Sequence, residues 1–494
     1  MVTLMAVSTL AASFLAAVLL LLAFLAGMIK TAYFSPLRRI PGPWHAHFTN
    51  LRLKVAVITG KRVYYVNDLH ARYGPVVRIS PAEIAVNDVK AFREIHRIGS
   101  GFNKSPWYQS FTEAKRPTMF AMTDPKQHAA RRKLFARTFS KTFLRQHWEN
   151  LVREKASLAV RRMEEEARRE GKTDMMKWWM FLATDVITHL MFGESFRTLE
   201  MGQKSEYSRL LEIVLQGAGI GAELPFMRPI LRAIPHPTIQ DMFHGATLLR
   251  SYAEVAVRNS RQLDSKANVF ATIITEAEKG ETEQLTDLDV KLEAGGFIVA
   301  GSDTTGITLT YLIWAILKRP ELQCAVEDEV SKLPETVTDA ALEQLPLLNA
   351  CIEETLRLYG AASGGLPRAV PPGGATLGGY FVPEGTTVTT QAWSLHRDAA
   401  NFTDPETFDP WRWLPPAVSG MSEQSKAAYS PFGAGSRTCV GIHLAGMELR
   451  LAAALFFRKM RGARLAEGMT DEVMEVENFF LIVPKGHYCD ITLS

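Results

Sequence analysis

The stretch Phe432-Gly433-Ala434-Gly435-Ser436-Arg437-Thr438-Cys439-Val440-Gly441 is the most informative segment of the 494-residue sequence. Glycines permit positive φ angles and close backbone approach, so this composition predicts a tight loop that brings backbone amides around one sulfur. Those amides, with the start of a helix expected over Ile442–Lys459, favour a thiolate over a thiol at Cys439. A thiolate in such a loop is a candidate metal ligand.

The spacing of this segment is as informative as its composition. Phe432 is followed by glycine three residues later, then by Arg437, Cys439 and a further glycine at steps of two. This pattern resembles the haem-binding signature of the cytochrome P450 family. A cysteine with a purely structural role in a turn would not require these five residues at this spacing. The resemblance implies that Cys439 is the axial ligand of the iron in haem b (iron protoporphyrin IX). It also implies that Phe432 and Gly433 belong to the cofactor-binding loop. Thiolate ligation favours cleavage of the oxygen-oxygen bond.

Two further segments carry a charged triad. Glu354 and Arg357 are three residues apart on an expected helix, where an exposed pair would contribute only a few tenths of a kcal/mol. The resemblance implies that this pair is buried and completed by Arg412, in the segment Phe408-Asp409-Pro410-Trp411-Arg412-Trp413. We expect the triad to be structural and to support the Cys439 loop, and its disruption to cost several kcal/mol.

A long helix is expected over residues 287–318, with Thr286 as its N-cap and Arg319-Pro320 as its stop. It contains four glycines, each costing about 1 kcal/mol against alanine in a helix interior: Gly295, Gly296, Gly301 and Gly306. The segment Ala300-Gly301-Ser302-Asp303-Thr304-Thr305 resembles the oxygen-activation motif of the family, which implies a groove for dioxygen over the haem. Reduction of dioxygen requires protons, which an alcohol and a carboxylate can supply. Asp303 and Thr304 are therefore the expected catalytic pair.

Basic residues are expected at the two propionates of the haem. Arg437 is one by its place in the motif. Residues 124–132 resemble the family helix with Trp-x-x-x-Arg, and His128 and Arg132 occupy the two positions, so histidine replaces the tryptophan. The histidine keeps a hydrogen-bond donor but leaves its tautomer open. Arg368 matches a further propionate contact.

The N-terminal leader is the clearest change in composition. No residue from Met1 to Ile29 has a charged side chain, and about 20 apolar residues suffice to cross a bilayer as a helix. A signal peptide should have a basic start, yet no Lys or Arg precedes Lys30, so we expect a retained anchor. The charges that follow, Lys30, Arg38 and Arg39, place the remaining chain in the cytosol by the positive-inside rule.

The remaining chain predicts a mainly α fold with small β-sheets, as in the cytochrome P450 fold. Helical spacing dominates residues 126–357, and strand-like runs are confined to residues 76–86 and 376–393. We expect a transmembrane anchor (1–30), a basic and Pro-rich hinge (31–45) and one catalytic domain (46–494). The four cysteines form no CxxC pair, which argues against a disulfide framework or a zinc site. The net charge of +4 comes from mixed signs and does not suggest a nucleic-acid partner.

The resemblance implies a single-pass enzyme of the endoplasmic reticulum membrane that inserts one oxygen atom from dioxygen into an apolar small molecule, by hydroxylation or epoxidation. Electrons would come from NADPH through NADPH-cytochrome P450 reductase, with cytochrome b5 as a further partner. The histidine in place of tryptophan at position 128 and the segment Trp411-Arg412-Trp413 are similar to fungal enzymes that tailor secondary metabolites. A local basic patch suits docking of an acidic redox protein, although a solvated face fits it nearly as well: Arg131, Lys133, Arg137, Lys141 and Arg145.

Other functions stay open at this point. One is a haem-thiolate enzyme that does not use dioxygen, such as an isomerase, a dehydratase or a peroxygenase, although Asp303-Thr304 argues against it. Another is a membrane haem sensor without enzymatic activity, and a third is a haem-free scaffold. The family implies substrate contacts around residues 101–122 and 215–227, at Ala300 and at 361–366. The small residues of 361–365 indicate a bulky substrate.

Overall fold

Helix α15 (Asp287–Leu317) is the central element of the computed structural model and packs most extensively against α9 (Met175–Phe192). It starts with a capping box, in which Thr286 and Asp289 satisfy each other's backbone amides, as the sequence predicts. Its second half is almost entirely buried, because α9, α18 (Pro346–Tyr359) and α21 (Ile442–Lys459) surround it. The element that carries Asp303 and Thr304 is therefore held rigidly from several sides.

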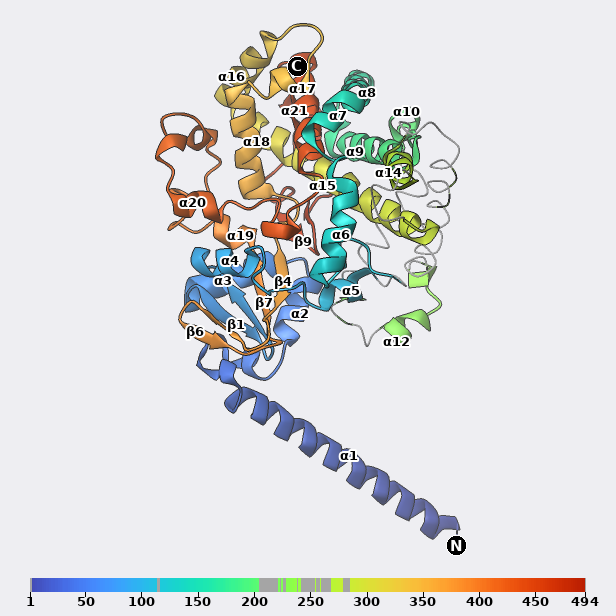
Figure 1. The fold of residues 1–494 in the computed structure, drawn as a ribbon, viewed down its shortest axis with the longest axis vertical. Coiled ribbons are helices and arrows are strands. Elements are labelled where there is room, and N and C mark those ends of the chain that lie inside the picture. Colours follow the sequence, from blue (N-terminus) through green and yellow to red (C-terminus); the bar gives the residue numbers. More distant parts are fainter. Residues whose placement is uncertain are drawn as a thin grey trace.

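The structure describes residues 2–112, 116–203, 221–222, 224, 228–237, 239–240, 254, 258, 268–278 and 285–493. Helices occupy one part of the body and the main sheet the other, and one long helix leads away from it (Figure 1). The remaining helices are α1 (Val2–Tyr33), α2 (Leu51–Ile58), α3 (Arg62–Tyr73), α4 (Val89–His96), α5 (Trp107–Thr112), α6 (Pro125–Ala136), α7 (Lys141–His147), α8 (Glu149–Glu170), α10 (Thr198–Met201), α12 (Arg228–Arg232), α14 (Val269–Glu278), α16 (Pro320–Ser331), α17 (Asp339–Leu342), α19 (Ala392–His396) and α20 (Glu423–Ala428).

Four small sheets accompany the helices in the described part of the chain. The largest has the order β1-β2-β7-β4, with β2 and β7 parallel and the other neighbours antiparallel. The strands are β1 (Val76–Ser80), β2 (Glu83–Val86), β3 (Thr173–Asp174), β4 (Gly365–Ala369), β5 (Ala375–Leu377), β6 (Tyr380–Val382), β7 (Thr387–Gln391), β8 (Arg464–Leu465), β9 (Val476–Asn478), β10 (Ile482–Pro484) and β11 (Asp490–Thr492). Both predicted strand regions are confirmed, but their confinement to two places is wrong. Strands of two or three residues, such as β8–β11, are too short to show alternation in sequence.

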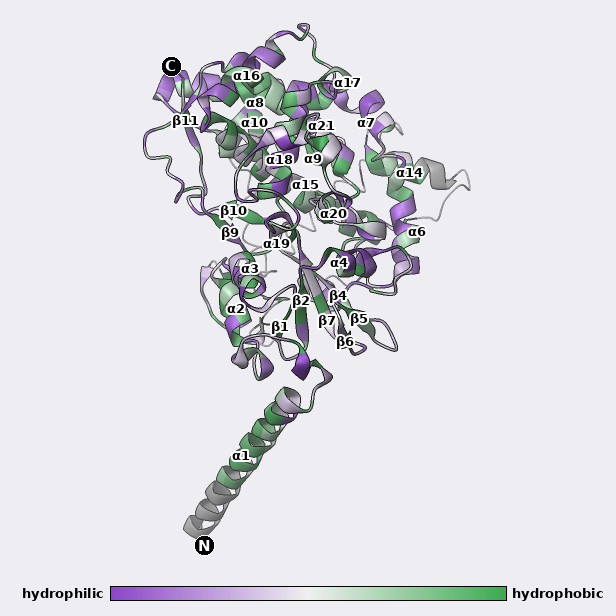
Figure 2. Cartoon of the chain, turned by 90° about the vertical axis from the view of Figure 1, so that its left-hand side faces the viewer, coloured by the Kyte–Doolittle hydropathy of each residue, from purple (hydrophilic) through white to green (hydrophobic). Residues whose placement is uncertain are grey.

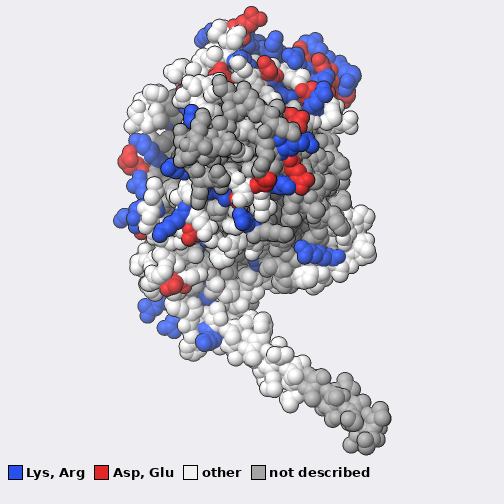
Figure 3. Space-filling view, turned by 45° about the vertical axis from the view of Figure 1, so that its right-hand side comes forward, with Lys and Arg blue, Asp and Glu red and all other residues white. Residues whose placement is uncertain are grey.

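The apolar leader forms α1, whose part Phe14–Tyr33 is long and apolar enough to cross a membrane. Its described side chains, from Phe14 onward, are mostly hydrophobic, and the helix is separate from the body (Figure 2). Charged side chains reappear where it joins the body (Figure 3). Buried Arg78 of β1 holds this junction, because its guanidinium donates to Thr31 O at the end of α1 (3.3 Å) and to Pro81 O (2.8 Å). A side chain at Gly42 would meet Arg78 O at 2.4 Å, so the hinge is packed against the sheet.

Two glycines of α15 have a packing role that the sequence did not indicate. A Cβ at Gly301 would lie 2.6 Å from Ile187, and one at Gly306 would lie 2.6 Å from Met180, both on α9. These two glycines therefore allow α9 and α15 to pack closely. Gly295 has no atom within 4 Å of such a Cβ. Gly295, Gly296 and Gly301 line the cavity together with Ala300, Asp303 and Thr304.

We expect the replacement Gly306→Ala to destabilise the protein, although alanine is the better helix former. The new methyl group would also lie 3.0 Å from the Met180 backbone, which cannot move aside, and overpacking of this kind costs about 1–3 kcal/mol. Gly295→Ala is the matched control on the same helix and should gain about 1 kcal/mol. Urea unfolding midpoints measure both changes. Equal stabilisation by the two alanines would contradict the packing argument.

Candidate functional site

A cavity of about 1260 Å³ lies in the body between α15 and the loop before α21. It brings together all nine residues that the sequence analysis assigned to catalysis or cofactor binding: His128, Arg132, Asp303, Thr304, Arg368, Phe432, Gly433, Arg437 and Cys439. They come from α6, α15, β4 and the cysteine loop, which are far apart in the sequence. Two wall segments were not predicted, residues 479–483 of the β9–β10 hairpin and Met180 with Phe181 of α9.

The cysteine loop has the backbone conformation that its glycines predict. Gly433 and Gly435 have φ angles of +73° and +65°. A Cβ at Gly435 would lie 1.9 Å from His96 O, so only glycine fits there. The Cys439 N–H donates to Phe432 O at 2.9 Å and closes the loop, and α21 begins directly after it.

The electrostatics of Cys439 correct one expectation. Its sulfur is open to the cavity yet lies deep inside the protein. This burial raises the pKa of the thiol, while the Gly441 N–H and the charge of Arg132 lower it to a smaller extent. We had expected the backbone amides and the helix start to favour a thiolate by themselves. They do not outweigh the effect of burial. A thiolate here needs the charge of a bound metal.

Glu354, Arg357 and Arg412 form the predicted triad, with Glu354 and Arg357 fully buried. Arg357 donates to both carboxylate oxygens of Glu354 at 2.8 Å, and Arg412 donates to Oε1 at 3.1 Å. Trp413 Nε1 donates to Oε2 at 2.9 Å, a contact that the sequence did not indicate. Burial alone would raise the pKa of Glu354, but the hydrogen bonds and charge of Arg357 hold it below its ordinary value. The triad does not line the cavity.

His396 connects this triad to the cysteine loop. Its Nδ1 lies 2.8 Å from Arg357 O, and its Nε2 accepts a hydrogen bond from the Ser430 N–H at 2.9 Å, just before Phe432. Burial lowers the pKa of His396 to about 3, so the ring is neutral, with the proton on Nδ1. No sequence pattern indicated this residue, because a single histidine carries no periodic signal.

Basic groups converge at one end of the cavity. Arg132 donates to Thr438 O (2.6 Å), Arg437 to Met122 O (2.9 Å) and Arg368 to Tyr108 Oη (3.2 Å). Lys104, which was not predicted, joins them and donates to Phe120 O at 2.5 Å. Desolvation and the charges of Arg368 and Arg437 lower the pKa of buried Lys104 well below its ordinary value. Desolvation and the same kind of repulsion lower the pKa of His128 to about 3 and that of Arg437 to about 10.

Asp303 and Thr304 face the cavity from α15. The Thr304 hydroxyl donates to Ala300 O at 2.7 Å, one turn back along the helix. Its oxygen can still accept a hydrogen bond from a group in the cavity.

Residues 40–489 match the family model for cytochrome P450. The chain belongs to the cytochrome P450 family. It is similar to cytochrome P450 monooxygenase cypX of Dothistroma septosporum, at 43% identity over 94% of this chain and 93% of that protein. It is also similar to cytochrome P450 monooxygenase stcB of Emericella nidulans, at 44% identity over 94% and 90%. Methylphloroacetophenone oxidase of Cladonia uncialis is 34% identical over 76% and 86%.

Membership in the P450 family implies haem, and the residues present fit that group. Within the described residues, no carboxylate forms an ion pair with Lys104, Arg132, Arg368 or Arg437, although all four approach one another at the cavity edge. Two propionates would supply the missing negative charges. Cys439 faces the same cavity and offers the sulfur ligand for the iron.

The regions expected to contact substrate are only partly within the described residues. Thr118, Met119 and Phe120 line the cavity, as do Ala300 and, from the small-residue segment, Ala361, Ala362 and Leu366. Residues 113–115 lie outside the described residues, and so does the expected segment 215–227 apart from 221, 222 and 224.

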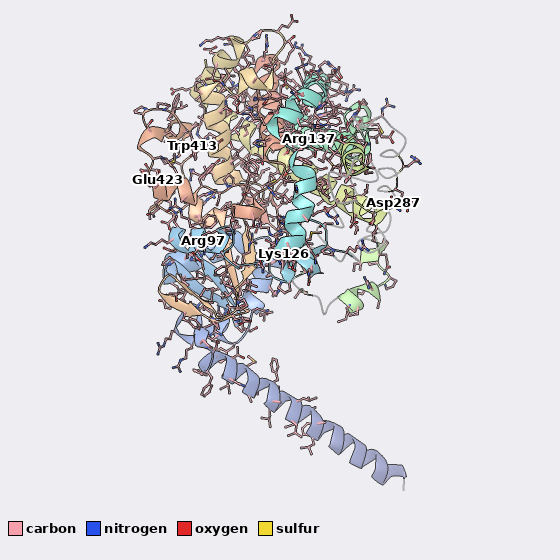
Figure 4. All side chains as sticks on the ribbon, viewed as in Figure 1. Arg97, Lys126, Arg137, Asp287, Trp413 and Glu423 are labelled. Atoms are coloured by element: carbon pink, nitrogen blue, oxygen red, sulfur yellow. The ribbon has the colours of Figure 1, made fainter. Side chains whose placement is uncertain are left out.

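The predicted basic docking patch is largely neutralised. Arg131 binds Asp289 (3.0 Å) and Glu293 (3.2 Å) of α15, and Arg145 binds Asp339 (2.7 Å). Lys141 pairs with Glu343. The patch therefore holds elements together rather than offering five free charges. Lys133 and Arg137 remain exposed, and Figure 4 shows Arg137 at the opposite end of α6 from Lys126.

Proposed function

We propose that the protein is a membrane-anchored haem-thiolate monooxygenase that transfers one oxygen atom from dioxygen to an apolar small molecule in fungal secondary-metabolite biosynthesis. The observation that carries the proposal is the cavity in which Cys439 and the Asp303-Thr304 pair meet, with cations converging at its edge. Bound haem with a thiolate ligand would supply the activation of dioxygen. The fungal monooxygenases among its relatives support the pathway assignment.

The residues of the chain have separate tasks in this proposal. Arg132, Arg368 and Arg437 would bind the propionates, with neutral His128 as a further hydrogen-bond partner. The Thr304 hydroxyl oxygen accepts a hydrogen bond from a group in the cavity, and Asp303 transfers protons between the cavity and solvent. Met180, Phe297 and Phe480 are among the apolar side chains that exclude water from the substrate.

The membrane and redox partners complete the proposal. Residues 1–30 would anchor the chain in the endoplasmic reticulum membrane, residues 31–45 would form the hinge, and residues 46–494 the cytosolic domain. NADPH-cytochrome P450 reductase would deliver electrons, with cytochrome b5 as a second donor. Glycosylation of exposed Asn103, which lies in an acceptor sequence, would contradict this orientation. The second acceptor, Asn401, is buried and cannot test it.

Reconstitution tests the proposed reaction directly. The full-length haem protein is combined with NADPH-cytochrome P450 reductase and NADPH, and apolar compounds are first screened for displacement of the water on the iron. For compounds that bind, we expect a product that carries one atom from isotopically labelled dioxygen. Product formation without NADPH and reductase would instead support an isomerase, a dehydratase or a peroxygenase. Spectral binding without any turnover would support a haem sensor.

We expect Thr304→Ala to lower product formation strongly while the haem spectrum stays unchanged. Loss of a group that positions a proton costs about 10²–10⁴-fold in rate when no other group replaces it. Thr310→Ala is the matched control, because Thr310 makes the same type of hydrogen bond, to Gly306 O, on the same helix but does not line the cavity. Product formation per minute and per NADPH measures both variants. Equal activity of Thr304→Ala and Thr310→Ala would remove Thr304 from the proposal.

A further inference from the structure

A buried carboxyl group lies on the cavity wall three turns before Thr304 along α15, at a distance of about 16 Å along the helix axis. This residue, Glu293, is only 2% exposed and lines the cavity. The Met119 N–H donates to its Oε1 at 2.9 Å, and Arg131 Nη1 donates to the same oxygen at 3.2 Å. Within the described residues, no hydrogen bond reaches Oε2. One oxygen therefore fastens the loop of Met119 to α15, and the other is left for a group in the cavity.

Small residues lead along α15 from Glu293 to Thr304. Gly296 and Ala300 continue the face of Glu293 at helical spacing, and both line the cavity, so we call them the glycine-alanine strip. A Cβ at Gly296 would meet only Thr118 among the described residues, at 3.8 Å, which is an ordinary contact. Packing within the described chain therefore does not require glycine here, although glycine is the poorer helix former. Room for a ligand is a physical reason for it.

Aromatic side chains line the same cavity. Phe297 of α15 stacks on Phe139, with ring centroids 5.2 Å apart and an angle of 21° between the planes. Phe120 and Phe480 meet edge to face at 5.8 Å. Flat ring systems pack favourably on such faces and edges. A smooth helix face in a cavity with aromatic walls fits a flat aromatic ligand better than a branched aliphatic one.

The charges around Glu293 are balanced, which favours an uncharged ligand group. Arg131 does not line the cavity and also binds Asp289 at 3.0 Å, and Arg116 approaches Asp289 at 3.7 Å. Because each acid already has a cation, a positively charged ligand would gain little net attraction. Burial raises the pKa of Glu293 to about 7, more than the charge of Arg131 lowers it. A hydroxyl group suits such a carboxyl group, because it can donate to the charged form and accept from the neutral form.

We propose that Glu293 determines which substrates the cavity accepts, by binding the hydroxyl group of a flat phenol that lies along the glycine-alanine strip with its opposite end beside Thr304. Oε2 of Glu293 accepts the hydrogen bond of that hydroxyl. The length of the strip selects a molecule of several fused rings, which is oxidised at a carbon far from the hydroxyl. Arg131 and the Met119 N–H hold the carboxyl group in position. This inference deepens the proposed monooxygenase function and rests on it.

Binding titrations with four related compounds test the proposal without turnover. The full-length haem-loaded protein is titrated at pH 8, where the Glu293 carboxylate dominates, and displacement of the water on the iron reports binding. The probes are 2-anthrol, its methyl ether, 2-(aminomethyl)anthracene as a cation, and fully hydrogenated 2-anthrol. We expect 2-anthrol to bind about tenfold more tightly than the ether, as one hydrogen bond to a carboxylate predicts. The amine and the saturated alcohol should also bind more weakly than 2-anthrol.

The variant Glu293→Gln separates substrate binding from a purely structural role. Glutamine keeps one oxygen for the Met119 N–H and Arg131, so the loop stays fastened, but its second group is an NH2 donor. That group cannot accept a hydrogen bond from a phenol. The tenfold preference for 2-anthrol over its ether should therefore disappear in Glu293→Gln. If Glu293 only fastens the loop, the preference will be absent from the unaltered protein or unchanged in the variant, and either result overturns the proposal.

Asp289→Asn is the matched control for Glu293→Gln. Asp289 is the other acid bound to Arg131, but it does not line the cavity, so its replacement should keep the preference for 2-anthrol. Loss of the preference in Asp289→Asn as well would assign the effect to the whole cluster and overturn the role of Glu293. If Glu293→Gln takes up no haem, Glu293→Asp, which draws the acceptor back by one methylene group, must lose the preference instead.

A side chain in the glycine-alanine strip tests where the rings lie. Gly296→Leu should weaken the binding of 2-anthrol and of its ether equally, by about tenfold, because leucine fills the space of the rings while Glu293 is unchanged. If Gly296→Leu fails to fold, Gly296→Ala must weaken both compounds in the same proportion, and alanine has room because its Cβ meets only Thr118 among the described residues. Unchanged affinity in a folded Gly296 variant would overturn this placement.

The remaining outcomes separate the inference from the function on which it rests. Tightest binding of the amine would assign Glu293 to a cation, and equal binding of the saturated alcohol would remove the aromatic class, so either overturns the proposal. If the expected preferences hold but no compound yields an NADPH-dependent product, the monooxygenase function fails and the binding site stands. If products form and the preferences are absent, the inference about Glu293 fails by itself.

Discussion

Replacement of Cys439 with serine is expected to abolish haem-thiolate character and activity together. A serine hydroxyl remains protonated at neutral pH and lacks the soft sulfur that iron binds. The reduced protein should therefore lose the thiolate-type shift of the haem band with carbon monoxide. Loss of an outer partner of a metal ligand already costs about 10–100-fold, so product formation should fall below about one hundredth.

Cys324→Ser is the matched control for Cys439→Ser. Cys324 is also accessible but lies on α16, outside the cavity. Its replacement should change neither the carbon monoxide spectrum nor the rate of product formation. A thiolate-type spectrum in Cys439→Ser would contradict the ligand assignment and favour a different ligand. Absence of this haem band already in the unaltered protein, with no change in either variant, would favour a haem-free scaffold.

Replacement of Glu354 with alanine is expected to be strongly destabilising. Arg357 would stay fully buried without its carboxylate, and breaking a buried pair in this way costs about 3–5 kcal/mol. That is a large part of the 5–15 kcal/mol that stabilises a typical domain. The pKa of Glu354 is below its ordinary value. Its contribution to the stability of the protein is therefore fully present above the ordinary carboxyl pKa, and it is lost as the pH falls through the lowered pKa of Glu354.

Urea unfolding and haem retention after purification measure the Glu354→Ala effect. The control is Glu164→Ala on α8, where an exposed pair with Arg168 at 2.7 Å should contribute at most about 0.5 kcal/mol. Because His396 transmits the position of Arg357 to Ser430, we expect Glu354→Ala to release haem before it unfolds. Haem retention equal to that of the control would contradict the coupling between triad and loop.

Local patterns determined much of the fold. The capping box at Thr286 and Asp289, the bounds of α21 and the glycine conformations of the cysteine loop depend on neighbours within a few residues. Their physical causes, hydrogen bonds to free helix amides and the freedom of glycine at positive φ, are written in short stretches of sequence. The short strands β8 and β11 have no such signal, because pairing with each other and with β3, far away in the sequence, creates them.

In the candidate site, too, some features follow from the local sequence and others only from the tertiary structure. By itself the sequence determined a loop around Cys439, an apolar leader and a helix that carries Asp303 and Thr304. Only the tertiary structure decided that Gly301 and Gly306 serve the packing of α9, that Lys104 joins the arginines, and that Arg131 is already paired. It alone also joined Thr305 to Glu448, 143 residues away. Burial and charge compensation depend on which distant segments meet, and no local pattern records that meeting.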